Sequence, residues 1–214
     1  MKPRILITAG PTREPLDTVR YLSNASTGAQ GVLLAEEALE RGWEADLVHG
    51  PMEVKVPQRV TAYPVTTAQQ MLDACKKLHA PCDILIGAAA VSDYRPREAL
   101  EHKRKRGAST WVLELVPTED ILKHLGKLKG KKIHAGFALE NEELFGNAAG
   151  KLREKNLDWI VANSPAAIGA HTSHYLLLGA DGTQRDLGLI SKRELAKALL
   201  DVVENQLRSS QAAE

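Results

Sequence analysis

The residues with the clearest chemical potential lie near the start of the chain. An apolar run ends at Gly10, and a polar connection carrying Arg20 and Asn24 then leads to Ser26-Thr27-Gly28. An arginine fork suits phosphate or carboxylate, and an asparagine amide can hydrogen-bond an oxyanion or a carbonyl. Free N–H groups at a helix start attract anions. The segment predicts a phosphate site whose loop also carries chemistry, with simple helix capping by Asn24 and Ser26 as the alternative.

Two further segments have residue types that suit a nucleotide. Small residues before Asp93 allow a planar ring to approach the backbone, and the Asp93 carboxylate suits ribose hydroxyls, a base or a metal, or else caps a turn. The run His102-Lys103-Arg104-Lys105-Arg106 is typical of a solvated face or a nucleic-acid patch. However, the net charge is only +1 and aromatic residues make up 4%, which argues against nucleic acid. A basic loop that closes over a polyphosphate fits better.

Lys151 and Lys155 are spaced to project from one face of a helix, which is also typical of an exposed flank. The seven histidines and two cysteines have no metal-ligand spacing, so any metal is expected to be Mg²⁺ arriving with a nucleotide. Cys75 and Cys82 are expected to be reduced thiols, and the expected compartment is the cytoplasm. No apolar run approaches the roughly 20 residues that span a membrane.

Alternating strands and helices must position these residues. The expected strands cover 5–9, 45–49, 60–64, 83–88, 110–116, 132–137 and 159–162, and the expected helices cover 28–41, 67–78, 119–128, 142–155 and 191–207. This alternation predicts an α/β fold with a Rossmann-like, doubly wound, mostly parallel sheet and helices on both faces. A small C-terminal hairpin is expected from strands 175–178 and 185–189 around Asp181-Gly182.

The expected organisation is a single nucleotide-binding domain over residues 1–208, a small protrusion between 95 and 111, and a polar tail over 209–214. Ligands of such sheets bind beyond the carboxyl ends of the strands, so Gly10, 88–93, 137–140 and Asn163 are expected to converge on one cleft. A nicotinamide cofactor would require an acidic residue after the second strand, where Val48-His49-Gly50-Pro51 has none.

Taken together, these segments resemble one family, phosphopantothenoylcysteine synthetase. Six blocks appear in order and span nearly the whole chain: TAGPTREPLDTVRYLSNASTG, AAAVSDYRP, the lysine-rich stretch from Lys103, EDIL at 119–122, GFALE at 136–140 and KLREKNLDWIVAN at 151–163. In many bacteria this activity forms the C-terminal half of a bifunctional protein whose N-terminal half is a flavin-dependent decarboxylase. The chain resembles the synthetase half alone, so FMN is not expected.

The resemblance implies a two-step ligation in coenzyme A biosynthesis. The carboxylate of 4′-phosphopantothenate attacks the α-phosphorus of CTP and releases pyrophosphate, and the amine of cysteine then expels CMP. Asn24 would contact the acyl intermediate, Arg20 would support the same loop, and Lys103 would stabilise charge in catalysis. The resemblance implies a nucleotide site formed by Gly10, Ser26, Gly28, Ala89, Ala90, Asp93, Lys103, Glu119, Asp120, Ile121, Leu122, Phe137, Lys151 and Lys155.

The resemblance also implies Mg²⁺ as cofactor and a homodimer whose partner completes part of the site. A separate phosphopantothenoylcysteine decarboxylase is a further expected partner. The sequence departs from the family pattern at Arg106, Glu119 and Leu139, which leaves CTP against ATP open. Two other functions remain as alternatives: a non-catalytic nucleotide-binding or regulatory partner of a decarboxylase, and an NAD(P)-dependent oxidoreductase.

Overall fold

The computed structural model describes residues 2–107, 109–140 and 144–212. Its centre is an eight-stranded sheet in the order β12-β11-β10-β9-β6-β1-β4-β5. The strands from β10 to β5 pair in parallel, and the hairpin of β11 and β12 adds an antiparallel edge. Their bounds are β1 Arg4–Ala9, β4 Glu44–His49, β5 Thr61–Pro64, β6 Ile84–Gly87, β9 Ile133–Leu139, β10 Trp159–Asn163, β11 Thr172–Gly179 and β12 Gln184–Ser191. The predicted α/β fold, parallel sheet and C-terminal hairpin are confirmed.

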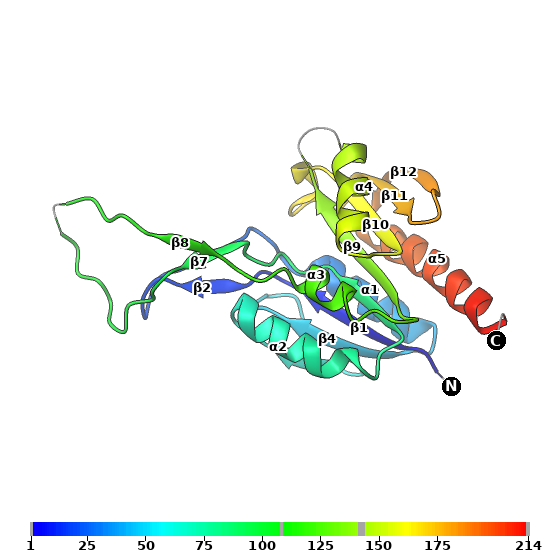
Figure 1. Ribbon diagram of the computed structural model, residues 1–214, viewed down its shortest axis with the longest axis horizontal. Helices are drawn as coiled ribbons and strands as arrows, with labels where there is room; N and C mark the ends of the chain where they lie inside the picture. The colour runs from blue at the N-terminus through cyan, green and yellow to red at the C-terminus, as the bar shows by residue number, and fades with distance from the viewer. Residues whose placement is uncertain (1, 108, 141–143, 213–214) are drawn as a thin grey trace.

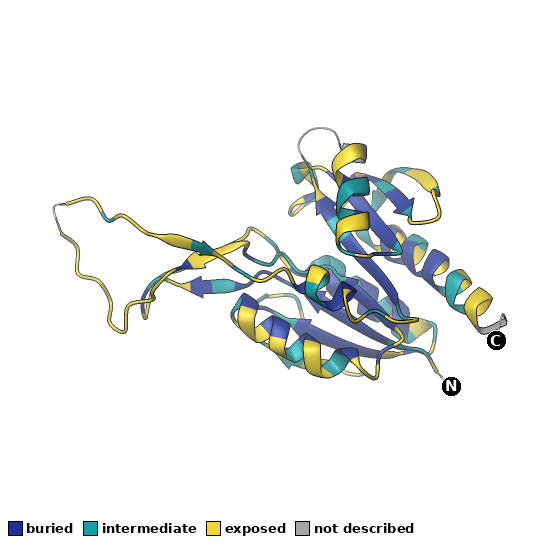
Figure 2. Ribbon diagram, viewed as in Figure 1, coloured by how far each residue is buried: buried dark blue, intermediate teal, exposed yellow. Residues whose placement is uncertain are grey.

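Helices cover both faces of the sheet because the strand side chains alternate between two apolar cores. Ile5 and Ile7 of β1 belong to the core beneath α1 (Ala29–Glu40) and α5 (Lys192–Ala212). Leu6 belongs to the core beneath α2 (Ala68–His79) and α3 (Ile121–Gly126), and α4 (Leu144–Glu154) covers β9 and β10 beside them. Figure 1 shows the long α5 running beside the sheet, and Figure 2 shows the buried strands between the helices.

A narrow arm projects from one end of the sheet (Figure 1). We use this name for the hairpin of β2 (Arg13–Pro15) and β3 (Tyr21–Ser23) together with the hairpin of β7 (Tyr94–Pro96) and β8 (Leu115–Pro117) and its loop 97–114. The predicted protrusion is therefore confirmed. The strand expected over 110–116 is wrong for 110–114, because no neighbouring strand pairs with that segment and β8 begins only at Leu115.

Capping residues set the helix boundaries. Thr67 and Gln70 form a capping box at α2, and Ser191 and Glu194 exchange hydrogen bonds at the start of α5. The last helix was expected to end at 207, but α5 continues to Ala212. The helix expected to begin at Glu142 has its first residues outside the described part of the chain.

Both cysteines are free and buried, as expected of reduced thiols, and burial raises the pKa of Cys75 to about 12. Within the described residues, no helix combines the length and the apolar character needed to cross a bilayer.

Candidate functional site

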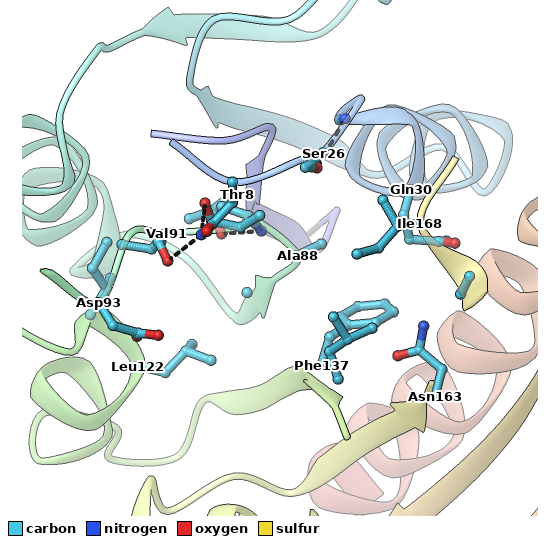
Figure 3. A pocket seen from close by; sticks show the side chains of 18 of the residues that line it. Thr8, Ser26, Gln30, Ala88, Val91, Asp93, Leu122, Phe137, Asn163 and Ile168 are labelled. Atoms are coloured by element: carbon cyan, nitrogen blue, oxygen red, sulfur yellow. Dashed lines mark hydrogen bonds between the residues drawn. The ribbon is translucent and has the colours of Figure 1, made fainter. Parts of the chain in front are cut away.

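A cleft of about 560 Å³ opens at the carboxyl ends of the parallel strands. Thr8 of β1, the residues after β6, Phe137 of β9 and Asn163 of β10 all line it (Figure 3). In the sheet, β1 lies between β4 on one side and β6 on the other. The strand order reverses direction at β1, so the cleft lies at the switch point of the sheet. The predicted convergence is confirmed for 88–91, Phe137 and Asn163.

The start of α1 forms one wall of the cleft. Gly28, in the left-handed region at φ 79°, is the N-cap residue and makes no side-chain cap. A side chain there would collide with Met52, since a Cβ would lie 2.4 Å from its Sδ. Ser26 Oγ accepts a hydrogen bond from the Gly28 N–H at 3.3 Å, so its hydroxyl bonds a residue before the first helical turn. Thr27 Oγ1 accepts from the N–H of Ala29, the first helical residue, at 3.3 Å. The next two N–H groups, of Gln30 and Gly31, have no side-chain acceptor among the described residues, and free N–H groups at a helix start attract anions.

Asn24 connects the arm to the floor of the cleft. Its Nδ2 donates to the carbonyl oxygens of Ala90 at 3.2 Å and Val91 at 3.0 Å. Because the amide nitrogen binds the β6 loop, Asn24 does not cap α1. Asn24 lines the cleft, and its Oδ1 makes no hydrogen bond to any described residue, so this oxygen is available to accept from a ligand.

Small residues after β6 form the floor. The N–H of Ala89 donates to Thr8 Oγ1 at 3.2 Å, and that of Ala90 donates to the carbonyl of Gly10 at 2.9 Å. Ala89 and Ala90 therefore line the cleft with their backbone fixed from below. Gly10 lies beneath this floor and is not among the lining residues. Its φ of 72° serves the close approach of β1 to Gly50, where a Cβ would lie 3.4 Å from the Gly50 carbonyl oxygen.

The end of the cleft formed by α3 and α4 holds paired charges. Lys151 Nζ lies 2.6 Å from Glu140, Lys155 Nζ lies 2.8 Å from Asp120, and Glu119 contacts His124. Burial acts to raise the pKa of Asp120, but hydrogen bonds from the Lys123 N–H and Lys155 bring it below its usual value. All the nucleotide-site residues expected from this end line the cleft, namely Asp93, Glu119, Asp120, Ile121, Leu122, Phe137, Lys151 and Lys155. The Asp93 carboxylate makes no ion pair or hydrogen bond with any described residue and faces the cleft (Figure 3).

The opposite end, between α1 and α5, contains Lys192 and Gln30, which sequence reasoning missed, together with the predicted Asn163. Lys192, at the start of α5, lines the cleft with no carboxylate partner among the described residues, and burial lowers its pKa. Its carbonyl accepts from Gln30 Nε2 at 3.2 Å, which joins α5 to α1. The Asn163 side chain is 9% exposed and makes no hydrogen bond within the described chain; Figure 3 shows it beside Phe137. The capping box at Ser191 located α5 in the sequence, but its position beside α1 depends on the β11–β12 hairpin.

Two residues expected to act in catalysis lie away from the cleft. Arg20 and Lys103 belong to the arm and are not among its lining residues. The Arg20 guanidinium binds the buried carboxylate of Asp17, with Nε at 2.9 Å from Oδ2. Lys103 is exposed on the long loop between β7 and β8. Arg20 Nη2 donates to the carbonyl of Arg104, the neighbour of Lys103, at 2.8 Å. Arg20 and Lys103 are therefore near each other, but neither lines the cleft of the same chain.

Fold and cleft together define a class: an open α/β sheet with a ligand site at its switch point, a helix start beside that site that suits an anion, and a basic projecting arm. Comparison with known families narrows this class. The chain belongs to the family described as the DNA/pantothenate metabolism flavoprotein C-terminal domain, whose model matches residues 1–207.

Individual relatives agree with this membership. The chain is 39% identical over 204 residues to the coenzyme A biosynthesis bifunctional protein CoaBC of Bacillus subtilis, covering 93% of this chain and 50% of the relative. It is also 44% identical over 173 residues to a protein named cysteine/cysteine sulfinic acid decarboxylase, from an unknown prokaryotic organism. This match covers 80% of this chain and 48% of that protein. The chain thus spans about half the length of the curated relatives it matches.

Solved structures agree with the fold. The C-terminal domain of a coenzyme A biosynthesis bifunctional protein CoaBC superposes with a TM-score of 0.85 at 39% identity, covering 97% of this chain and 96% of that one. A Cab2 H337A mutant in complex with phosphopantothenate-cysteine has the same fold at 19% identity, with a TM-score of 0.78, covering 98% of this chain and 89% of that one.

Proposed function

We propose that the protein is a phosphopantothenate–cysteine ligase of coenzyme A biosynthesis that uses CTP. The 4′-phosphopantothenate carboxylate attacks the α-phosphorus of CTP, the bond to the β-phosphate oxygen breaks, and pyrophosphate leaves. The cysteine amine then attacks the acyl carbon of the acyl-cytidylate, loses a proton and expels CMP. The observation that carries the proposal is a cleft at the switch point lined by both Asn24 and the start of α1, in a chain of this family.

The proposed chemistry does not require a protein nucleophile. In-line attack at phosphorus requires positioning and neutralisation of charge, which hydrogen bonds and cations supply. The N-terminus of α1 and the Lys192 side chain, which has no carboxylate partner among the described residues, support binding of the nucleotide phosphates at the α1–α5 end. Phe137 and the small residues Ala89 and Ala90 offer flat, apolar surface for the base.

Asn24 lies between these groups and the arm. With its nitrogen bound to the Ala90 and Val91 carbonyls, its Oδ1 is held toward the cleft as an acceptor. An acceptor there can orient the cysteine ammonium, or the amide N–H of phosphopantothenate, beside the activated carboxyl group. Both steps require the acyl group at this position, so loss of Asn24 should affect ligation more than nucleotide binding.

Mg²⁺ fits the site through the substrate. The described residues contain no group of three metal-ligating side chains, and Mg²⁺ commonly binds one or two carboxylates plus substrate phosphates. Asp93 lies at the α3–α4 end of the cleft, so an ion held with phosphates at the α1–α5 end would take its ligands from phosphate oxygens and water. When bound, Mg²⁺ would supply neutralisation of phosphate charge.

A homodimer and a cytoplasmic location complete the proposal. Tyr21, Tyr94 and Val112 on the arm are 48%, 54% and 83% exposed. A second copy would cover this apolar surface, and it would give Lys103 a cleft to act on, since Lys103 does not line its own. A separate phosphopantothenoylcysteine decarboxylase would use the product.

The test is pyrophosphate release by the purified protein with 4′-phosphopantothenate, cysteine and Mg²⁺, in parallel reactions with CTP, ATP, GTP and UTP. We expect release with CTP that depends on phosphopantothenate, and formation of phosphopantothenoylcysteine. Absence of release with every nucleotide would disprove the ligase. Complex formation with a decarboxylase, without turnover by this protein, would favour the non-catalytic alternative instead.

A further inference from the structure

The position of Lys103 poses a structural problem that the cleft alone does not solve. Lys103 lies in the loop 97–114, which extends from a hairpin of only three residues on each side. Most side chains of this loop are exposed, and no apolar core lies beneath it (Figure 2). Fixing such a segment costs backbone entropy that only specific contacts can offset. Some group outside the loop must therefore hold it.

Asp17 is that group. Its side chain is 0% exposed although it lies on the arm. Its Oδ1 accepts from the N–H groups of Val19 at 2.9 Å and Arg20 at 2.8 Å. Its Oδ2 accepts from the Arg20 guanidinium, through both Nε and Nη2, and from the N–H of Arg104 at 3.2 Å. Burial acts to raise the pKa of Asp17, but these hydrogen bonds hold it well below its usual range, so the carboxylate is charged.

Arg104, the residue next to Lys103, is held through both its backbone N–H and its backbone carbonyl. Its N–H donates to Asp17, and its carbonyl accepts from Arg20 Nη2 at 2.8 Å. The guanidinium groups of Arg20 and Arg104 also both stack on Trp111, at 4.8 and 4.9 Å from the ring centroid. Two segments distant in sequence are thus joined by one carboxylate, two arginines and one indole, which we call the Asp17 clasp.

We propose that Asp17 is a positioning residue for the ligation, and that it acts by holding the Lys103 loop through Arg104. This inference rests on the proposed function. Lys103 is one residue from the clasp, about 3.8 Å along the chain from the Cα of Arg104, so the clasp sets where the Lys103 side chain begins. Arg20 takes part in the clasp through its Nε and Nη2.

The test is Asp17→Asn, which keeps the shape of the side chain and removes the charge that Arg20 and the Arg104 N–H share. With CTP and saturating substrates, we expect kcat for pyrophosphate release to fall about 10- to 100-fold, since misplacement of a reacting group by about 1 Å costs up to that much. The KM for CTP should change less than about twofold, because the cleft is untouched. Asp17→Glu, which retains the charge, should recover part of the lost kcat.

The matched control is Glu114→Gln. It breaks an ion pair with Arg97 on the same loop, in which the two side chains are 58% and 66% exposed. Exposed pairs of this kind contribute little, so kcat should stay at the wild-type value. An equal fall in kcat for Glu114→Gln and Asp17→Asn would overturn the proposal, because any disturbance of the arm would then suffice.

A double variant separates positioning from general stabilisation. If Asp17 acts through Lys103, Asp17→Asn should lower kcat far less in a Lys103→Gln background than in the wild-type background. The proposal would be overturned if the fold-loss in kcat of the double variant equalled the product of the two single losses. It would also be overturned if Asp17→Asn kept the wild-type kcat.

A readout without substrates keeps this result separate from the ligase hypothesis. Tryptic cleavage after Lys103 to Arg106 should be about tenfold faster in Asp17→Asn than in Glu114→Gln, since cleavage follows the population of the released loop. The fluorescence of Trp111, obtained as the difference between proteins with and without Trp111→Phe, should also change when Asp17→Asn is introduced. If wild type releases no pyrophosphate, the ligase hypothesis fails whatever this assay shows. If wild type is active but cleavage and emission are unchanged in Asp17→Asn, the clasp proposal alone fails.

Discussion

The sheet with its helices and the projecting arm are held together in different ways. The central strands of the sheet are mostly buried, and Ile5, Leu6 and Ile7 of β1 are 0% exposed. The arm exposes apolar side chains such as Val112 and depends on polar contacts centred on Asp17. The cleft belongs to the first region, whereas Lys103 and Arg20 belong to the second.

This difference separates binding from catalysis. A close-packed body can provide a preformed cleft for a nucleotide. An arm with few apolar contacts can place a cation late in the reaction, but little of the folding free energy depends on it. Substitutions in the body should therefore change stability, and substitutions in the arm or at its junction with the body should change turnover at constant stability. Substitutions in each region test this separation.

Asn24→Asp, at the junction of arm and body, should have the largest effect. The substituted carboxylate would face the carbonyl oxygens of Ala90 and Val91, which now accept from Asn24 Nδ2. We expect ligation to fall about 10²- to 10³-fold, similar to the loss of a catalytic hydrogen bond, with little change in melting temperature because Asn24 is exposed. Product formation, followed as CMP and phosphopantothenoylcysteine, measures it. Full activity would remove Asn24 from the mechanism, and Asn205→Asp on the exposed face of α5 is the control.

Lys103→Gln should lower turnover about 10²-fold while leaving nucleotide affinity and stability near the wild-type values. The ammonium is expected to stabilise charge that develops at phosphorus, and such interactions act on kcat. Lys105→Gln removes a cation two residues further along the same exposed loop and should cost less than about threefold, since dispersed surface charge contributes little. Similar losses in the two variants would mean that the loop acts by its total charge. The assay is pyrophosphate release with calorimetric binding of CTP.

One added methyl group compares the packing of the two regions directly. In the body, a Cβ at Gly31 would lie 2.4 Å from the Cβ of Ala9, whereas in the arm a Cβ at Gly107 would meet nothing within 4 Å. Gly31→Ala should lower the free energy of unfolding by about 1–3 kcal/mol through overpacking. Gly107→Ala should be neutral within about 0.5 kcal/mol. Urea unfolding measures both, and equal values would show that the body is less tightly packed than the structure has it.

The same distinction explains what could be predicted from the sequence. The strands of the body were predictable because buried parallel strands appear as short apolar runs, and the helix starts because Thr67 and Ser191 cap them. The strand expected over 110–114 failed because alternation indicates a strand only where another strand pairs with it.

For the cleft, residues that follow strands were predictable, because parallel strands end at one edge: Ala89, Ala90, Asp93 and Phe137 line it. Lys192 and Gln30 were not, because they meet only through the packing of α5 against α1. The ion pairs of Lys151 and Lys155 were likewise invisible, since their partners Glu140 and Asp120 come from other elements.

A buried histidine pair gives the smallest expected effect and lies in the body, away from the cleft. His79 and His134 are 4% and 0% exposed, and their Nε2 atoms are 2.9 Å apart. One nitrogen must donate and the other accept, so the pair cannot carry a proton on all of its nitrogens without breaking this bond. Burial, followed by the nearby His79, Lys129 and Lys132, lowers the pKa of His134 to about 3. Burial and Lys132 also lower the pKa of His79.

Because folding lowers the pKa of both histidines, the free energy of unfolding should decrease as the pH falls. As pH falls below about 6.5, the unfolded chain binds protons that the folded chain does not, so the stability present above that pH is lost progressively down to the folded pKa of His134, about 3. The free energy of unfolding of the wild type should fall by about 1 kcal/mol per pH unit for His134 alone between pH 6 and 5. His134→Gln should be less stable at pH 7.5 but show a shallower slope, whereas His102→Gln, exposed on the arm, should keep the wild-type slope. Parallel slopes for all three proteins in urea titrations would show that the core of the body does not titrate, and that the acid sensitivity lies elsewhere.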